Sequence, residues 1–189
     1  MAFKTQRTPD DEKLQELILY LAYLSERDRN FGAVKLNKLL FYADFLAYQK
    51  FGTSITSQQY QAFPKGPAPK RLKPVIERMK RSGCLVIQKE RKFRFSQLRP
   101  IALRAPALHK FSGEQTDLVR DVVTRFWELN ATQISDESHL FLGWQLGIQG
   151  ETIPYSVVLI GTRKPTQAER RKGRALQKLA KEALAGAHR

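Results

Sequence analysis

Residues 34–52, VKLNKLLFYADFLAYQKFG, place ionisable and polar side chains on a helix that is apolar around most of its circumference. At about 100° per residue, these polar side chains fall in two strips that span roughly 60° and roughly 40°. The strips consist of Lys35, Lys38 and Tyr42, and of Asn37, Asp44 and Tyr48. Because an unpaired buried charge is costly, each strip either pairs inside the fold or faces a bound partner. For any single residue we favour pairing inside the fold.

Patterns for catalysis and for metal binding are scarce. His139 beside Asp136 and Glu137 has the residue types of a general base, although such a histidine more often caps a helix or completes a core hydrogen bond. With one cysteine and three histidines, the chain has no Cys/His zinc spacing. It also lacks glycine-rich phosphate loops and the G-x-S-x-G nucleophile elbow. We therefore expect no enzyme, no metal and no cofactor.

Positive charge is the strongest compositional feature. The net charge of +15 is concentrated in two stretches. Residues 65–104 contain 13 Lys/Arg against 2 Asp/Glu, and residues 163–189 contain 9 against 2. Such local fields attract polyanions or an acidic protein face, so both stretches are candidate sites for nucleic acid. The simpler interpretation is a surface that keeps the protein in solution.

Length and cysteine usage favour one intracellular domain. A chain of 189 residues can bury its own core, and the lone Cys84 cannot form an internal disulfide. The N-terminus becomes charged before any apolar stretch, and no apolar run approaches about 18 residues. We therefore expect neither a signal peptide nor a membrane span, and we expect the protein in the cytoplasm.

Two helices are predicted in the first third of the chain. Thr8 and Pro9 suit the cap and the first position of a helix whose apolar stripe runs over residues 14–24. The wide apolar arc of residues 34–52 predicts a central helix. The stretch FPKGPAP, residues 63–69, has too many prolines for a helix or strand interior and predicts a stiff loop.

Further helices are marked by capping signals. A helix ends at Arg81 and starts either near Pro69 or within residues 71–74, which would put Pro74 in its first turn. A capping box of Ser112 and Gln115 predicts the start of the next helix. A short helix is expected to begin at Ser135 or Asp136. A second capping box, of Thr166 and Glu169, predicts a basic terminal helix.

Strand signals are few. Residues 55–63 read as a short strand, and CLVI and KFRF, on either side of QKER, predict a hairpin. The following LRPIALRAPAL reads as an irregular connector, and TIPYSVVLIG as a strand or extended segment. The predicted fold is therefore mainly α (α+β): one helical domain over residues 8–162 with a small antiparallel β element, and a basic helical extension over residues 163–189.

A helix followed by a hairpin within the basic stretch 65–104 resembles the recognition helix and wing of a winged-helix DNA-binding protein. Many helix–hairpin units are only scaffolding, so this pattern supports a nucleic-acid-binding protein or regulator as an alternative function. A structural or adaptor protein is a third class.

Four motifs together resemble a known family. They are FGAVKLNKLLFYADFLAYQKFGTSIT, YQAFPKGPAPKRLKPVIERM, ISDESHLFLGWQLG and TIPYSVVLI. In this order and spacing, over roughly residues 10–162, they resemble the Panacea (SocA-like) antitoxin domain of bacterial and prophage proteins. The resemblance implies that the protein neutralises a toxin encoded beside it by direct binding. One member of that family implies an alternative mechanism, in which the protein is an adaptor that delivers its toxin to a protease.

The resemblance carries no catalytic set, only motif positions. These are Lys35, Asn37, Lys38, Tyr42, Asp44, Tyr60, Gly66, Pro67, His139, Trp144 and Tyr155. It also implies that the polar strips of the central helix tie it to the FPKGPAP loop and to residues 139–144. For contacts to the toxin we expect whichever aromatic side chains are exposed among Tyr42, Tyr48, Tyr60, Trp144 and Tyr155, together with Arg71. The net positive charge predicts that the toxin presents an acidic face.

Overall fold

The structure is a computed structural model, and it describes residues 8–92, 95–141, 145 and 150–159. Its helices are α1 (Asp11–Leu24), α2 (Ala33–Phe51), α3 (Leu72–Arg81), α4 (Gly113–Arg125) and α5 (Ala131–His139), with short 3-10 turns η1 (Leu108–Lys110) and η2 (Tyr155–Leu159). Its strands are β1 (Tyr60–Gln61), β2 (Ala68–Pro69), β3 (Leu85–Lys92), β4 (Phe95–Ala102) and β5 (Thr152–Ile153). The mainly helical fold with small antiparallel elements is therefore confirmed.

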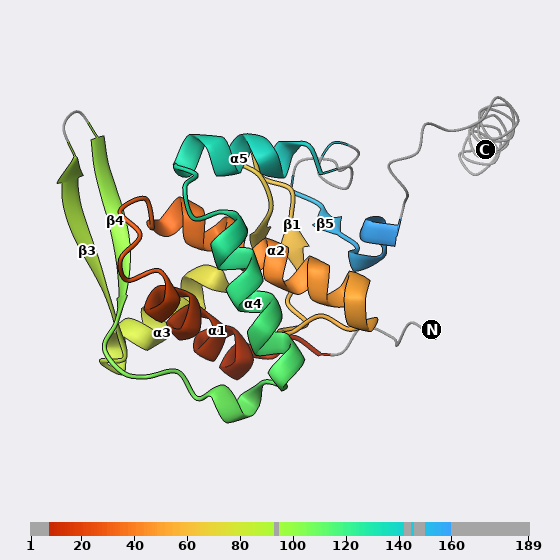
Figure 1. Cartoon of the computed structure of the whole chain (residues 1–189), viewed down its shortest axis with the longest axis horizontal. Helices are drawn as coiled ribbons and strands as arrows, with labels where there is room; N and C mark the ends of the chain where they lie inside the picture. Colours follow the sequence, from red (N-terminus) through yellow and green to blue (C-terminus); the bar gives the residue numbers. More distant parts are fainter. Residues whose placement is uncertain (1–7, 93–94, 142–144, 146–149, 160–189) are drawn as a thin grey trace, which may run out of the picture.

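Helix α2 is the centre of the domain, as its wide apolar arc predicted. It packs against α1, α4, α5 and η2, and Figure 1 shows it running through the middle of the molecule. Leu36, Leu39, Leu40 and Phe41 of this helix are fully buried. The helix ends where Gly52 adopts the left-handed conformation with φ of 73°.

The first helix begins later than Thr8 and Pro9 predicted. Asp10 caps α1, because its carboxylate accepts a hydrogen bond from the backbone N–H of Lys13 at 2.8 Å. Asp11 and Glu12 then occupy the first turn, where the helix dipole favours negative charge. The N-cap of α1 is therefore the first residue of the acidic stretch Asp10, Asp11 and Glu12.

Two of the later helix starts follow the sequence signals and one does not. Helix α3 begins at Leu72, so Pro74 lies in its first turn, and the capping box of Ser112 and Gln115 opens α4. The predicted start of α5 at Ser135 or Asp136 is wrong. Asn130 caps this helix in a box with Gln133, which adds a turn before those residues. The predicted helix from Thr166 lies outside the described residues.

The β structure of the described residues forms two separate antiparallel sheets. In the first, the two-residue strand β1 lies between β2 and β5, so that Tyr60 is paired with both Pro69 and Ile153. In the second, β3 and β4 form the predicted hairpin at one side of the molecule (Figure 1). The predicted turn and second strand are wrong, because residues 88–91, QKER, lie within β3. The second strand, β4, shares only Phe95 with the predicted strand KFRF and includes residues 98–102, which were expected in a connector.

Within the described ranges, no helix is both long enough and apolar enough to cross a membrane.

Candidate functional site

Lys35 in the first turns of α2 is buried together with its partner, Asp28. Lys35 is 1% exposed and Asp28 3%, and the ammonium lies 2.6 Å from the Asp28 carboxylate. Its Nζ also donates to the backbone carbonyls of Trp127 and Leu129, each at 2.8 Å. An ammonium has three donors, and three acceptors surround this one. Lys35 thus joins α2 to the α1–α2 loop and to the segment between α4 and α5.

Lys38, one turn further along α2, holds the proline-rich loop as the family resemblance implied. Its buried Nζ donates to the carbonyl of Lys65, and the carbonyl of Pro67 lies 3.5 Å away. Burial lowers the pKa of Lys38 to about 8. Gly66, between these carbonyls, has φ of 91°, and a side chain there would overlap the ammonium. The loop therefore needs glycine at position 66 in order to wrap around Lys38.

Asp44, on the other strip of α2, is a fully buried carboxyl without a basic partner among the described residues. It accepts hydrogen bonds from the backbone N–H of Thr56 at 2.7 Å, from the Thr56 hydroxyl and from the Tyr60 hydroxyl at 2.9 Å. Burial raises the pKa of Asp44, against the opposing effect of these donors. The Tyr60 hydroxyl also lies 2.9 Å from the carbonyl of Leu40, so one phenolic proton faces two acceptors.

We expect Asp44 to make folding stability fall as pH rises. A raised pKa means that the folded protein binds the proton more tightly than the unfolded chain does. The resulting stabilisation is complete below the unfolded pKa, about 3.9, and is lost as pH rises through the higher folded pKa. Urea unfolding from pH 4 to pH 8 should therefore show the Asp44→Asn variant gaining stability relative to the wild type as pH increases.

A difference between the two proteins that does not change with pH would contradict this. Asp117→Asn, which neutralises an exposed carboxyl on α4, is the control for the change in net charge. At each pH, the free energy of unfolding of Asp44→Asn must be compared with that of the wild type. Asp11 and Glu16 have lowered pKa values, so in both proteins they make stability rise with pH, which is opposite to the effect of Asp44.

The predicted aromatic contacts divide into buried and half-buried side chains. Tyr60 and Tyr155 are buried, and the Tyr155 hydroxyl donates to the carbonyl of Gln58 at 2.7 Å. Tyr42 is half-buried and stacks on Phe126, with ring centroids 4.4 Å apart, while Tyr48 stacks on Tyr155. In this conformation, Tyr60 and Tyr155 build the core and do not offer a surface to a partner.

The remaining candidate residues lie at several different places in the fold. Asn37 and His139 are half-buried, and Pro67 is buried in the loop above Lys38. Arg71 is 52% exposed, but its guanidinium is bound to the Asp11 carboxylate, with Nη2–Oδ2 at 2.6 Å. Trp144 lies outside the described residues. The structure thus gathers Lys35, Lys38 and Asp44 along α2 and leaves Arg71 apart, at the start of α3.

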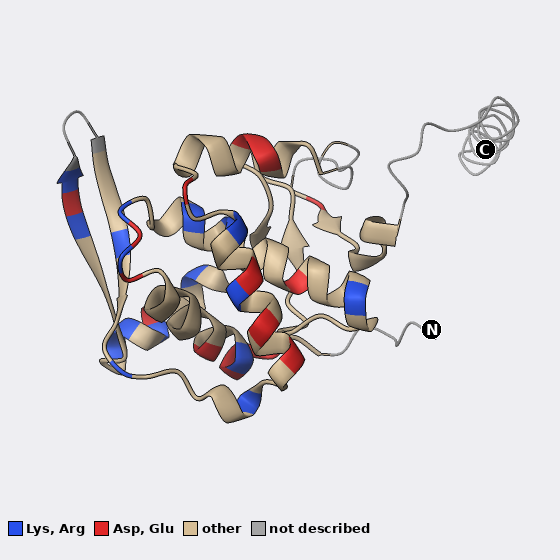
Figure 2. Ribbon diagram, in the orientation of Figure 1, with Lys and Arg blue, Asp and Glu red and all other residues tan. Residues whose placement is uncertain are grey.

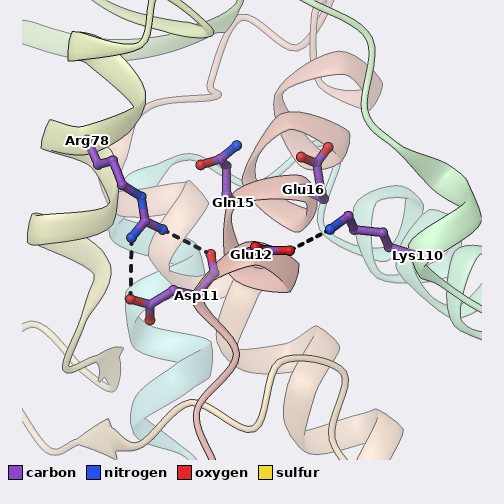
Figure 3. Close-up of a pocket in the computed structure, with 6 residues that line it drawn as sticks. All are labelled: Asp11, Glu12, Gln15, Glu16, Arg78 and Lys110. Atoms are coloured by element: carbon purple, nitrogen blue, oxygen red, sulfur yellow. Dashed lines mark hydrogen bonds and ion pairs between the residues drawn. The ribbon is translucent and has the colours of Figure 1, made fainter.

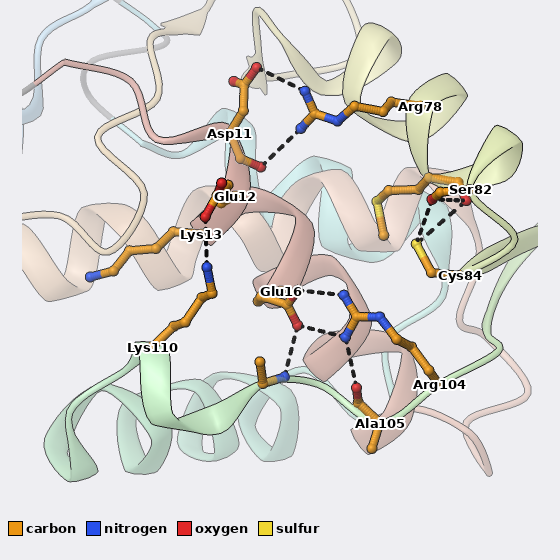
Figure 4. Close-up of polar contacts among 12 residues, drawn as sticks. Asp11, Glu12, Lys13, Glu16, Arg78, Ser82, Cys84, Arg104, Ala105 and Lys110 are labelled. Carbon is orange, nitrogen blue, oxygen red and sulfur yellow. Dashed lines mark hydrogen bonds and ion pairs between the residues drawn. The ribbon is translucent and has the colours of Figure 1, made fainter.

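A charged cleft of about 520 Å³ lies where the start of α1 meets α3 and η1 (Figure 3). Asp11 contacts Arg78 of α3, and Glu12 contacts Lys110 of η1 at 2.7 Å. Glu16 is bound by Arg104, at 2.5 and 2.9 Å, and by the backbone N–H of Ala107 (Figure 4). Ion pairs around the cleft therefore join α1 to α3, to η1 and to the segment that contains Arg104.

These contacts determine the protonation of the three carboxyl groups. The hydrogen bond from Arg71 lowers the pKa of Asp11, that from Lys110 lowers the pKa of Glu12, and that from Arg104 lowers the pKa of Glu16. All three are ionised at neutral pH, so they suit ion pairing and not proton donation. No three His, Cys, Asp or Glu side chains in the described part of the chain are placed to hold a metal ion.

The basic stretch 65–104 is thereby divided into paired and outward-facing charges. Four of its arginines, Arg71, Arg78, Arg99 and Arg104, are held by carboxylates or backbone carbonyls of the α1 region. Other cations remain exposed, and Figure 2 shows Lys and Arg along the hairpin. They include Lys73 and Arg81 of α3 and Lys89 and Arg91 of β3. Outward charge is therefore available on both α3 and the hairpin.

The fold and the loop geometry around α2 are those of a small helical domain built around one buried helix that carries a few polar side chains. The family model described as antitoxin SocA-like, Panacea domain, matches residues 36–145, which is more than half of the 189-residue chain. The chain therefore belongs to the SocA-like Panacea domain family, as its motifs predicted. Membership supports an antitoxin-type role in general, with a toxin as the class of partner.

The match is narrower than the resemblance, which was expected over roughly residues 10–162. Lys35 and the segment TIPYSVVLI lie outside it, and the predicted domain bounds of 8–162 stay a prediction. Neither a curated protein nor a solved structure matches the chain.

The sequence did not predict which groups pair with the polar side chains of α2. Asp28, the carbonyls of Trp127 and Leu129, and Thr56 are contacts that no motif indicated. The only available signal was general: a buried ammonium and a buried carboxyl each require acceptors or donors from elsewhere in the chain.

Proposed function

We propose that this protein is a cytoplasmic antitoxin that neutralises a toxin encoded beside it by forming a stoichiometric complex. The observation that carries the proposal is the family match over residues 36–145. The structure supports binding over catalysis in one respect, since the carboxylates of the charged cleft are ionised and already engaged by basic side chains. The buried polar groups of α2 maintain the scaffold, so the toxin would contact its surface.

Co-expression is the direct test of this function. We expect the neighbouring gene alone to arrest growth, and we expect growth to be restored when this protein is produced with it. The purified proteins should then co-elute as a complex that buries on the order of 1,200–2,000 Å² in total, the usual range for stable interfaces. If the neighbour alone leaves growth unaffected, or arrests it equally when this protein is present, the proposal fails.

The same experiment separates occlusion from delivery to a protease. Direct occlusion should restore growth equally in strains that lack ATP-dependent proteases, with the toxin still present in the cells. An adaptor would lose its protective effect in such a strain, and in the wild-type strain the toxin would disappear.

Nucleic-acid binding is the second candidate function. The exposed cations of α3 and the hairpin favour it, among them Lys73, Arg81, Lys89 and Arg91. Against the winged-helix form of this hypothesis, residues 52–71, which include β1 and β2, separate α2 from α3. A helix-turn-helix motif instead joins its two helices by a turn of about 3–4 residues.

A further inference from the structure

A second cleft, of about 540 Å³, opens between the hairpin and the first turns of α2 and α5. Figure 1 shows the hairpin standing beside the starts of both helices. Its walls include Ser96 and Leu98 from β4, Val34 from α2, and Ala131 and Thr132 from α5. Among the described residues that line it, the one ionisable side chain is Lys35, which is already paired with Asp28. These described residues suit the binding of a partner.

The hairpin wall of this cleft is attached to the rest of the domain by side-chain hydrogen bonds. Gln97 of β4 donates from Nε2 to the carbonyl of Phe31 at 2.5 Å and packs so closely on Gly32 that a Cβ there would lie 2.7 Å from its Cγ. Arg99 donates to the carbonyls of Glu26, at 2.6 Å, and Asp28, at 2.8 Å. These bonds attach the hairpin to the α1–α2 loop. A preorganised cleft loses little entropy when it binds.

Next to the apolar wall of the cleft are two exposed cations of β3, Lys89 and Arg91, which we call its basic rim. Leu98 is 50% exposed although it is a large apolar side chain. Across the hairpin, Leu98 is paired with Lys89 and Ser96 with Arg91, and cross-strand partners project from the same face of a sheet. Lys89 and Arg91 are both exposed and have no ion-pair partner among the described residues. The acidic residue of the hairpin, Glu90, is instead 3.7 Å from Arg99.

We propose that this cleft receives an acidic segment of the toxin, with one apolar side chain inserted against Leu98 and Val34 and with carboxylates facing Lys89 and Arg91. The inference rests on the proposed antitoxin function, because the partner is the toxin that the protein neutralises. A cleft of this size covers only part of a stable interface, so it serves as the anchoring pocket of a larger contact. The basic rim would also accelerate association with an acidic partner.

Two variants of the cleft test the proposal, each with a matched control. Leu98→Glu places a negative charge on the apolar wall, and Lys89→Glu/Arg91→Glu reverses the rim. Leu103→Glu changes another exposed leucine beyond the end of β4, and Lys73→Glu/Arg81→Glu reverses two exposed cations of α3. The dissociation constant is measured with the purified product of the neighbouring gene, and melting temperatures verify folding.

We expect each cleft variant to bind at least about tenfold more weakly and each control to stay within about twofold of the wild type. If the wild type binds and both cleft variants stay within about twofold of it, the inference is overturned while the antitoxin function stands. If the wild type neither binds nor restores growth, the antitoxin function itself is overturned.

A second measurement keeps the inference testable without the toxin. Random peptides displayed on phage are selected on the whole protein. The enriched peptides should carry Asp or Glu beside an apolar residue, and they should bind Leu98→Glu at least about tenfold more weakly. Enriched peptides that are not acidic, that bind both proteins equally, or that fail to appear at all would overturn the proposal.

Binding of a DNA duplex is the competing explanation for the exposed cations of the rim. Suppose that the duplex binds the wild type and is lost from Lys89→Glu/Arg91→Glu, while Leu98→Glu binds toxin and peptides normally. The rim charges would then serve phosphate contacts, and the proposal would be overturned.

Discussion

Replacing Lys35 by methionine is expected to lower the free energy of unfolding by about 3–5 kcal/mol, because it removes one partner of a buried ion pair. The substitution leaves the Asp28 carboxylate, 3% exposed, without its cation. It also removes the donor to the carbonyls of Trp127 and Leu129, and so detaches α2 from the segment between α4 and α5. Urea unfolding at pH 7 measures the loss directly.

Two further variants establish the cause. Lys50→Met, at the exposed end of the same helix, should change stability by no more than about 0.5 kcal/mol. The double variant Lys35→Met/Asp28→Asn should lose less than the sum of its single substitutions, because the second change removes the stranded charge. A loss below about 1 kcal/mol for Lys35→Met would show that the ion pair does not hold the domain together.

Gly66→Ala is the second substitution with a large expected effect, a loss of about 2–4 kcal/mol. Part of this loss comes from backbone strain, since residue 66 has φ of 91°. The rest comes from overlap, because a Cβ at this position meets the Lys38 ammonium and lies 2.5 Å from the Ser138 hydroxyl oxygen. Neither neighbour can move freely, as Lys38 is held by the loop carbonyls and both residues are buried.

Alanine substitutions at two other glycines distinguish the backbone strain of Gly66→Ala from its steric overlap. Gly83 has φ of 69° with open space around its Cβ position, so Gly83→Ala measures strain alone. Gly113, in the first turn of α4, has neither strain nor a close neighbour, so Gly113→Ala should be neutral or slightly stabilising. Thermal unfolding should rank the losses in the order 66, 83, 113. Equal losses at 66 and 83 would exclude any contribution from the contact with Lys38.

Both substitutions also separate scaffold from contact surface. In the co-expression assay, Lys35→Met and Gly66→Ala should lose protection only to the extent that the folded protein is lost. Leu98→Glu should lose protection while its melting temperature is unchanged. A scaffold variant that remains folded and still fails to protect would place its residue in the partner contact.

The sequence by itself determined the central helix, the starts of α3 and α4, and the polar strips. The capping box of Ser112 and Gln115 and the start of α3 near Pro74 depend on residues within about four positions of one another, so local patterns predict them well. The apolar arc of residues 34–52 indicated a central helix for the same reason. The start of α5 was missed because Ser135 and Asp136 offered equally good caps, although Asn130 is the residue that accepts the backbone N–H groups.

Only the tertiary structure decided what the polar strips do. Lys35 meets carbonyls more than 90 residues away along the chain, and Tyr60 pairs with Ile153 through an equally distant strand. Periodicity places a side chain on a face of a helix, but it does not say which segment covers that face. Burial of Tyr60 and Tyr155, and exposure of Leu98 beside Lys89, were decided in the same way, by long-range packing that no local pattern records.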